Sequence, residues 1–288
     1  MDKPIQRISG NKLMEQPQVS VCLPAFNAEA YLMEAVQSVQ RQSFPNWELI
    51  IMNNASRDQT SELLRRLVAI NHDSRITVHQ HVNTLSMVQN WNSAIHRAKG
   101  QYLKLLCADD LLMPDCLERQ VQALERHPTV VLAAGSRVII NRKGRRLFIR
   151  NGIGASGVYS GTEIIRRCIL SGTNIIGDPV NVMWRRSTMD QAGIFDLEML
   201  YCADVEYWLR LLQAGDLFYD RKPVGSYRIH PSASAISLAD KTVDDFLRTV
   251  DKVNQRGRIQ LSSRQRHRVR FRSWYKNKIR GFLYRFLG

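Results

Sequence analysis

Two adjacent carboxylates, Asp109 and Asp110, stand between two apolar runs in the segment LLCADDLL, residues 105–112. Neighbouring carboxylates repel each other, and apolar flanks make their charge harder to solvate. A hard divalent cation, which prefers oxygen ligands and often shares them with substrate phosphates, would relieve that repulsion. The segment therefore indicates a metal site, and the alternative is a helix start at Asp110 beside a solvated Asp109.

Polar clusters of this kind follow three predicted strands. Apolar runs over 19–24, 47–52, 75–80 and 101–107 predict short buried strands, and each is followed by a segment with the apolar spacing of a helix. This alternation is typical of an α/β fold with a doubly wound, mostly parallel sheet flanked by helices. Such sheets bind ligands outside the carboxyl ends of their strands, which is where PAFN, NNASRD and CADD lie in this sequence.

The alternation weakens after residue 128, where further strands and helices follow in a less regular order. No internal repeat and no Gly/Ser-rich linker interrupts residues 17–235. We therefore expect one domain over 17–235, with residues 236–288 as a basic, helical C-terminal extension.

The composition restricts the class of protein. A chain of 288 residues with 44% apolar and 23% charged residues is typical of a soluble globular protein, which excludes global disorder. The start of the chain is polar and no window approaches eighteen consecutive apolar residues, so we expect neither a secretory signal nor a spanning helix. Five scattered cysteines without a CxxC pair indicate reduced core residues of a cytoplasmic protein.

The net charge of +15 is concentrated at the C-terminus. Residues 254–288 carry eleven Lys or Arg and no acid, which leaves +4 on the rest of the chain. One side of the predicted helix carries Phe271, Tyr275, Ile279, Phe282 and Phe286. The cations that fall largely away from that side are Arg268, Arg272, Lys276 and Arg280.

This mixture over residues 264–288 is typical of an interfacial helix attracted to anionic lipid, so we expect an anionic membrane surface as a partner. One alternative is a helix that packs on the body and has a basic outer face. Another is a nucleic-acid-binding tail. We rank nucleic acid lower because the excess of cations is confined to the tail, while the acids at the strand ends repel phosphate.

Four segments, in register, resemble the inverting glycosyltransferases of family 2, which have the nucleotide-binding GT-A fold. They are VSVCLPAFNAEAYLMEAVQSVQRQSFPNWELIIMNNASRDQT, AKGQYLKLLCADDLLMPDCLE, ADVEYWLRL and YRIHPSAS. The resemblance spans residues 19–232. It implies transfer of a sugar from a UDP- or dTDP-sugar to a glycan or lipid-linked acceptor, with Mg²⁺ or Mn²⁺ as cofactor. By analogy, the setting is cell-surface polysaccharide synthesis at the inner face of the cytoplasmic membrane.

The resemblance places the donor nucleotide at the first two polar clusters. The residues implied to hold its base and ribose are Pro24, Ala25, Phe26, Asn27 and Glu29. Asn53 replaces the family's usual Asp; its amide can still accept a hydrogen bond from uracil, but without the charge, which leaves thymidine donors open. Ser56 keeps the family pattern, as does Asp58, which is equally suited to capping the next helix. Asn90 and Asn92 also correspond to the nucleotide side.

CADD corresponds to the family's metal-binding D-x-D-D segment, with Cys107 in place of the first Asp. The resemblance implies that Asp109 binds the Mg²⁺ or Mn²⁺ ion and contacts the donor, and that Asp110 is a ligand or a ribose contact. His230 matches a position that approaches the metal or the diphosphate. Arg228, beside it, suits a diphosphate.

The segment ADVEYWLRL matches the family's E-D-x-x-x-W-x-R-L helix start, and alignment on Trp208 puts Asp204 at the catalytic base. Inversion by direct displacement needs one carboxylate to take the proton of the acceptor hydroxyl. Glu206 is the fallback base, and a helix N-cap is the structural alternative for Asp204. The departures at Asn53 and Cys107 keep a non-catalytic nucleotide-sugar binder as an alternative function.

Overall fold

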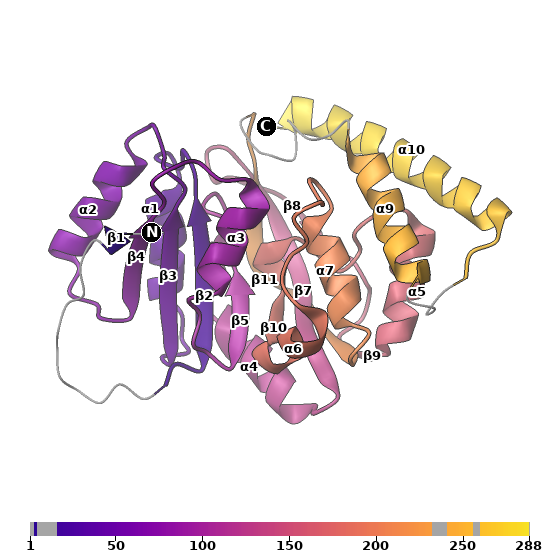
Figure 1. The fold of residues 1–288 in the computed structure, drawn as a ribbon, viewed down its shortest axis with the longest axis horizontal. Helices are drawn as coiled ribbons and strands as arrows, with labels where there is room; N and C mark the ends of the chain where they lie inside the picture. Colours follow the sequence, from indigo (N-terminus) through magenta and orange to yellow (C-terminus); the bar gives the residue numbers. More distant parts are fainter. Residues whose placement is uncertain (1–2, 5–15, 232–240, 256–259, 288) are drawn as a thin grey trace.

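The computed structural model describes residues 3–4, 16–231, 241–255 and 260–287, without the side chains of 3–4 and 282–287. Helices pack around one eleven-stranded sheet (Figure 1), which confirms the expected α/β class. The expected boundary between residues 235 and 236 lies outside the described residues. The side chains of Phe282 and Phe286, which were predicted for the apolar side of the C-terminal helix, also lie outside them.

The sheet has the strand order β1-β4-β3-β2-β5-β10-β7-β11-β6, with β8 paired to β7 and β9 to β11. The strands are β1 Lys3–Pro4, β2 Val19–Ala25, β3 Trp47–Asn53, β4 Ile76–Gln80, β5 Tyr102–Leu105, β6 Leu111–Leu112, β7 Val130–Asn141, β8 Arg146–Arg150, β9 Gly157–Tyr159, β10 Met183–Arg185 and β11 Asp216–Ile229. The α-helices are α1 Leu32–Gln40, α2 Thr60–Ile70, α3 Met87–Ile95, α4 Cys116–Arg126, α5 Gly161–Ser171, α6 Met189–Ala192, α7 Ala203–Leu211, α9 Thr242–Gln255 and α10 Ser263–Leu287.

The first half of the sheet has the predicted parallel arrangement. Strands β4, β3, β2 and β5 lie side by side and parallel, so their carboxyl ends meet at one edge. The second half is mixed, because the short strand β10 inserts antiparallel between β5 and β7 while β11 runs parallel to β7. A three-residue strand shows no periodicity in a sequence, which is why β10 was not predicted.

Strand β2 is buried on both faces, as its continuous apolar run requires. Cys22 packs with Trp91 of α3 on one face of the sheet. Val21 and Leu23 belong to a second cluster on the other face, which includes Val36 of α1. The loop that follows β2 therefore leaves a strand that is fixed from both sides.

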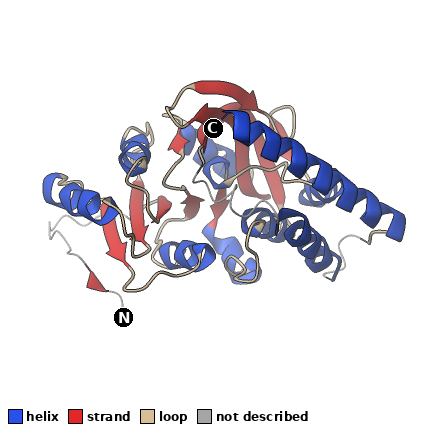
Figure 2. Cartoon of the chain, turned by 90° about the horizontal axis from the view of Figure 1, so that it is seen from above, coloured by secondary structure: helices blue, strands red, loops and turns tan. Residues whose placement is uncertain are grey.

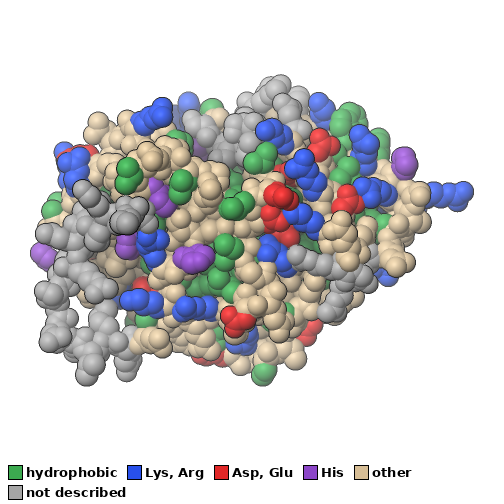
Figure 3. Space-filling view, in the orientation of Figure 1, with side chains coloured by type: hydrophobic (Ala, Val, Ile, Leu, Met, Phe, Trp, Pro, Cys, Tyr) green, Lys and Arg blue, Asp and Glu red, His purple; other side chains and the backbone are tan. Residues whose placement is uncertain are grey.

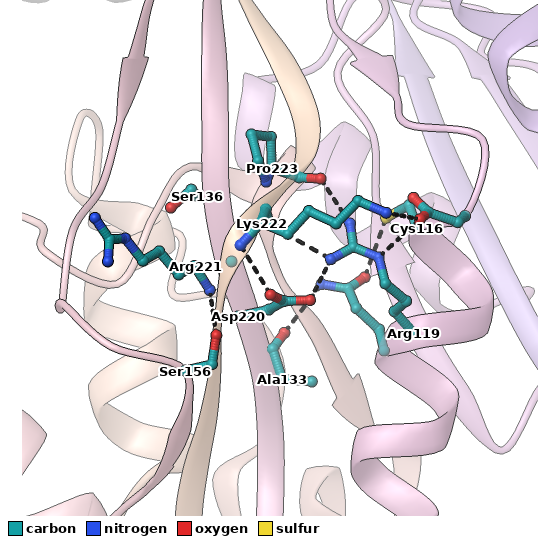
Figure 4. A network of polar contacts seen from close by, with 12 residues as sticks. Cys116, Arg119, Ala133, Ser136, Ser156, Asp220, Arg221, Lys222 and Pro223 are labelled. Atoms are coloured by element: carbon teal, nitrogen blue, oxygen red, sulfur yellow. Dashed lines mark hydrogen bonds and ion pairs between the residues drawn. The ribbon is translucent and has the colours of Figure 1, made fainter.

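A network of polar contacts fixes β11 against α4 (Figure 4). Arg119 of α4 donates a 2.6 Å hydrogen bond to the carbonyl of Pro223 and forms an ion pair with Asp220. Lys222 reaches Asp115 at 2.5 Å. These contacts fix the middle of β11. Its C-terminal part pairs with β6 and donates the Arg228 N–H to Asp110, so it lies beside the segment between β5 and α4 that contains the adjacent carboxylates.

The helical extension packs on the body through α10, which crosses α5 and α9 (Figures 1 and 2). At Gly172, where φ is +71°, an added Cβ would lie 2.8 Å from the backbone nitrogen of Ser273, so the close crossing depends on glycine. Arg272 and Lys276 donate to the last carbonyls of α5, those of Leu170 at 2.6 Å and Ser171 at 2.9 Å. Among the described helices, none combines the length and apolar character that crossing a bilayer requires.

Candidate active site

A cavity of about 1240 Å³ opens at the carboxyl ends of β2, β3 and β5. The loops after these three strands form one end of it, and the other end is formed by the C-terminus of α5, the start of α7 and the inner side of α10. The predicted residues that line it are Pro24, Phe26, Asn27, Glu29, Asp58, Asn90, Asp109, Asp110, Asp204 and His230. The predicted residues outside its lining are Ala25, Asn53, Ser56, Asn92, Glu206 and Arg228.

Hydrogen bonds join the loops after β2 and β3 into one wall. Ser56 Oγ accepts the backbone N–H of Asn27 at 3.0 Å and donates to Asn53 Oδ1 at 2.6 Å. Asn53 is fully buried, and its amide nitrogen donates to Ser61 at 2.9 Å. Asn53 and Ser56 therefore hold the wall from behind, whereas the half-exposed Phe26 presents its ring to the cavity.

Asp58 completes this wall. Its carboxylate accepts the backbone N–H groups of Glu29 and Thr60, both at 3.0 Å. Partial burial opposes its ionisation, but the hydrogen bonds from Thr60 and Glu29 outweigh that effect and hold the pKa of Asp58 below its ordinary value. The N-cap of α2 is Gln59, so Asp58 is not the N-cap that the structural alternative expected. Asp58 lies one residue earlier, where it supports the first turn of α2 and joins the two loops.

Asn90 and Asn92, two residues apart on α3, have different environments. The side-chain amide of Asn92 is fully bonded to the backbone of Phe195. It donates to the carbonyl of Phe195 at 2.8 Å and accepts the N–H of the same residue at 3.1 Å. Asn90 lines the cavity with a side chain 3% exposed, and its Oδ1 has no hydrogen-bond partner in the described structure. A buried acceptor without a partner at a cavity wall suits a ligand donor.

The loop after β5 gathers the possible metal ligands. Cys107, Asp109 and Asp110 each offer a ligand atom, and these three atoms lie within 4.8 Å of one another. Burial and the nearby charge of Asp109 raise the pKa of Asp110 well above its ordinary range. Burial, together with the charges of Asp109 and Asp110, likewise raises the pKa of the Cys107 thiol. The residues fit a divalent cation, because its charge would relieve the repulsion that adds to the effect of burial in both shifts.

His230 and Arg228 hold this loop in different ways. His230 Nε2 lies 3.0 Å from Asp109 Oδ2, and its ring packs on Tyr31 with the centroids 5.0 Å apart. Arg228 is 1% exposed, and its guanidinium donates to the carbonyl of Asp109 at 2.9 Å and to Glu34 at 2.7 Å. These bonds favour a role for Arg228 in fixing the loop over direct contact with a diphosphate.

Asp204 lies in the cavity at the start of α7, which begins at Ala203 and so includes Asp204 in its first turn. Its Oδ1 accepts the N–H of Val205 at 2.7 Å, and its Oδ2 accepts from the side chain of Asn174 at 3.0 Å. Burial and the charge of Asp178 raise the pKa of Asp204 to about 7. Such a carboxylate is suited to proton transfer near neutral pH.

Two cavity residues near Asp204 were not predicted from the sequence. Asn174 is bonded to Asp204, and Asp178 forms an ion pair with Arg137 of β7 at 2.8 Å. Both lie between α5 and β10, where the sequence carries no motif. The fallback base, Glu206, is 3% exposed, does not line the cavity and pairs with Arg210 at 2.6 Å.

Two solved structures have a fold similar to that of this chain. The structure of S. aureus TarS 1-349 in complex with UDP-GlcNAc superposes with a TM-score of 0.67 and 16% identity, over 89% of this chain and 71% of that chain. The mannosyltransferase PcManGT from Pyrobaculum calidifontis, in complex with GDP-Man and Mn²⁺, gives a TM-score of 0.64 and 15% identity over 95% and 74%. These likenesses confirm the GT-A-type fold.

Two curated relatives are more similar in sequence over shorter parts of the chain. The putative glycosyltransferase EpsE of Bacillus subtilis is 35% identical over 111 residues, which are 38% of this chain and 40% of EpsE. The putative teichuronic acid biosynthesis glycosyltransferase TuaG of the same organism is 39% identical over 108 residues, 37% of this chain and 42% of TuaG. The matches thus span less than half of either relative. The family model of glycosyl transferase family 2 matches residues 20–191, which is more than half of the chain. The chain therefore belongs to glycosyltransferase family 2.

Proposed function

We propose that this family 2 glycosyltransferase is a metal-dependent, inverting enzyme in which Asp204 is the catalytic base. The donor would be a UDP- or dTDP-sugar, and the acceptor a glycan or a lipid-linked glycan. The observation that carries the proposal is that one cavity contains the loops after β2 and β3, the carboxylate pair Asp109 and Asp110, and Asp204. A donor nucleotide, a metal ion and an acceptor hydroxyl therefore have a common space in which to meet.

The proposed cation is Mg²⁺ or Mn²⁺, held by Asp109 and Asp110. Carboxylate oxygens suit these hard cations, and the loop already brings two carboxylates close together. When bound, such a cation would stabilise the negative charge of the departing nucleoside diphosphate. The hydrogen bond between His230 and Asp109 would orient that ligand from behind, as partners of metal-bound carboxylates do.

The proposed reaction is a single displacement. The acceptor oxygen forms a bond to the anomeric carbon while the bond from that carbon to the phosphate oxygen breaks on the opposite side. The proton of the acceptor hydroxyl moves to the carboxylate of Asp204, whose pKa of about 7 lets it be ionised at neutral pH and still accept a proton. Glu206 is unsuited to this step because its carboxylate is buried against Arg210.

The nucleobase would be bound between Phe26 and Asn90. Phe26 offers an exposed aromatic face for stacking, and Asn90 offers an unpaired acceptor oxygen. Uracil and thymine both carry one ring N–H that could donate to such an oxygen. Asn53, which the resemblance assigned to the base, would act indirectly by holding Ser56 and the loop.

The name of one relative supports the proposed cellular role. TuaG is named as a teichuronic acid biosynthesis glycosyltransferase, and this supports a role for the present chain in cell-surface polysaccharide synthesis. We place that role in the cytoplasm at the inner face of the membrane, where nucleotide sugars are the donors.

Slow transfer of the sugar to water tests the proposal without knowledge of the acceptor. The full chain would be incubated with UDP- and dTDP-sugars in the presence of Mn²⁺, and the released nucleoside diphosphate measured. We expect release that stops when the metal is chelated and in Asp204→Asn, but persists in Glu206→Gln if that variant remains folded. Binding of a donor with no release above the Asp204→Asn background would overturn the catalytic assignment in favour of a non-catalytic nucleotide-sugar binder.

A further inference from the structure

Helix α10 exposes a stripe that contains both cations and aromatic rings. Residues three and four apart on a helix share one side, and such spacing connects Arg264, Arg268, Phe271, Tyr275 and Lys278, all of which are exposed. Arg268 therefore lies on the side of Phe271, which corrects the expectation that it falls away from the apolar side. Lys and Arg side chains and hydrophobic side chains gather together over α10 in the space-filling view (Figure 3). We call these five residues, with the exposed Trp274 and Ile279, the outer face of α10.

The outer face is not the side by which α10 packs. The opposite side carries Val269 and Ser273, which are 1% and 2% exposed, and meets Gly172 at the end of α5. The packing needs of α10 are therefore already met by the body. The aromatic residues of the outer face remain exposed on a helix whose place is fixed.

The three aromatic residues form one patch. Phe271, Trp274 and Tyr275 are 63%, 49% and 54% exposed. The ring centroid of Phe271 lies 6.1 Å from that of Trp274 and 6.3 Å from that of Tyr275. Large exposed aromatic side chains that touch one another mark an interaction site more often than chance, and Trp and Tyr are the residues enriched where protein meets the headgroup region of a bilayer.

We propose that the outer face of α10 binds the surface of an anionic bilayer. Its cations complement the negative surface, and its aromatic rings would enter the headgroup region. The sequence of α10 contains no acid that would oppose this attraction. Because cations interrupt the apolar stripe, the helix would lie at the surface and bind in a salt-dependent way.

The inner side of the same helix faces the cavity, which connects bilayer binding with the acceptor. Ser273, Lys276, Asn277 and Arg280 of α10 line the cavity end opposite the nucleotide loops. A helix is roughly 10 Å thick, so a bilayer on the outer face would lie one helix diameter from this end. In this part, which rests on the proposed function, the acceptor is carried by the bilayer and enters the cavity at the end that α10 lines.

Nucleic acid is the competing partner for a surface of cations and aromatic rings. The bilayer is favoured because the outer face carries Trp274, 49% exposed, a residue type that is enriched in the headgroup region of a bilayer. The apolar Ile279, 43% exposed on the outer face, also suits lipid better than a phosphate backbone.

Co-sedimentation of the full chain with vesicles tests the proposal. The vesicles would be phosphatidylcholine alone and phosphatidylcholine mixed with phosphatidylglycerol, without nucleotide or metal. We expect binding only to the anionic vesicles, reduced by salt and weakened roughly tenfold or more in the triple variant Phe271→Ser/Trp274→Ser/Tyr275→Ser. The control is Ile70→Ser/Val82→Ser, which removes two side chains 77% and 71% exposed, on α2 and after β4, and should bind as the unmodified chain does.

Equal binding by the triple variant, or no binding of the unmodified chain to anionic vesicles, would overturn the proposal. Tighter binding to a single-stranded oligonucleotide than to the vesicles would replace the bilayer with nucleic acid. Because the substituted side chains are exposed, the melting temperature should stay close to that of the unmodified chain, so lost binding is not confused with unfolding. Vesicle binding is measured without a nucleotide-sugar donor. A loss of vesicle binding therefore tests only this inference, whereas a loss of nucleoside diphosphate release tests only the proposed function.

Discussion

The side-chain amide of Asn174 donates a 3.0 Å hydrogen bond to Asp204, while its oxygen accepts the backbone N–H groups of Ile176 and Gly177, both at 3.0 Å. The two backbone N–H groups fix which end of the amide faces Asp204, because a flipped amide would place donors against donors. Asn174 therefore orients the proposed base and stabilises its ionised form. It is a positioning residue, since it acts through Asp204.

Replacement of Asn174 by Asp should shift the pH dependence of turnover. The new carboxylate can still accept the N–H groups of Ile176 and Gly177, but it places a like charge beside Asp204 and raises the pKa of that residue further. The rate should then fall at neutral pH and recover at alkaline pH, as a profile of kcat against pH would show. Asn174→Ala removes the hydrogen bond that favours the ionised carboxylate but adds no charge, so it should lower kcat about tenfold and move the profile to higher pH by less than Asn174→Asp does. An unchanged profile in Asn174→Asp would contradict the positioning role.

Asp204 should make the metal-free protein less stable as the pH rises. Its folded pKa of about 7 lies above the ordinary value, so between about pH 4 and pH 7 the folded state holds a proton that the unfolded state has lost. The stability associated with this group is therefore lost as the pH rises through the folded pKa. The difference in unfolding free energy between Asp204→Asn and the unmodified chain should therefore shift in favour of the variant by on the order of 1–3 kcal/mol as the pH rises from 5 to 8. Urea titrations at the two pH values measure this, and an equal difference at both would show that Asp204 is not perturbed.

Cys107 should weaken the binding of magnesium. Its thiol occupies the position where the family has a carboxylate, which replaces a hard, charged ligand with a soft one of high pKa. Cys107→Asp should raise the affinity for Mg²⁺ about tenfold, with a smaller gain for Mn²⁺. Metal titrations by calorimetry in the presence of UDP measure both, and Cys107→Ala separates loss of the thiol from gain of the charge. Equal Mg²⁺ affinity in Cys107→Asp and the unmodified chain would place position 107 outside the metal site.

Asn90 and Asn92, two residues apart on α3, allow a matched pair of alanine variants. Asn92→Ala breaks two hydrogen bonds to Phe195 and should lower the unfolding free energy by about 1–3 kcal/mol, with unchanged donor affinity per folded molecule. Asn90→Ala removes an oxygen without a partner in the described structure, so it should cost less stability but weaken UDP binding about tenfold. Thermal unfolding and calorimetric titration measure the two effects. The reverse pattern would remove Asn90 from the base-binding site.

Local sequence signals were sufficient for the first half of the fold. Strand β2 is apolar along its length because both of its faces are covered, and this makes it recognisable without any tertiary information. Asp109, Asp110 and Asp204 lie in motifs of fixed spacing on or beside such elements, and the structure brings all three into one cavity.

Contacts between side chains that lie far apart in the sequence could not be predicted from it. Arg228 follows the pattern of a residue that binds phosphate, but it is held by Glu34, 194 positions away, and this contact depends on how α1 packs against the end of β11. Asn174 likewise lies in a segment without a motif. Its place beside Asp204 follows from the packing of α5 and α7 and from no property of the segment itself.

The most direct test of the donor and metal site is calorimetric titration of UDP and dTDP into the purified full chain, with and without Mn²⁺, and again with Asp109→Asn. The proposed site predicts binding of at least one nucleotide that strengthens with Mn²⁺ and loses that dependence in the variant, because Asp109 is a ligand. Absence of binding by the folded, unmodified chain, or binding that Mn²⁺ and Asp109→Asn leave unchanged, would contradict it.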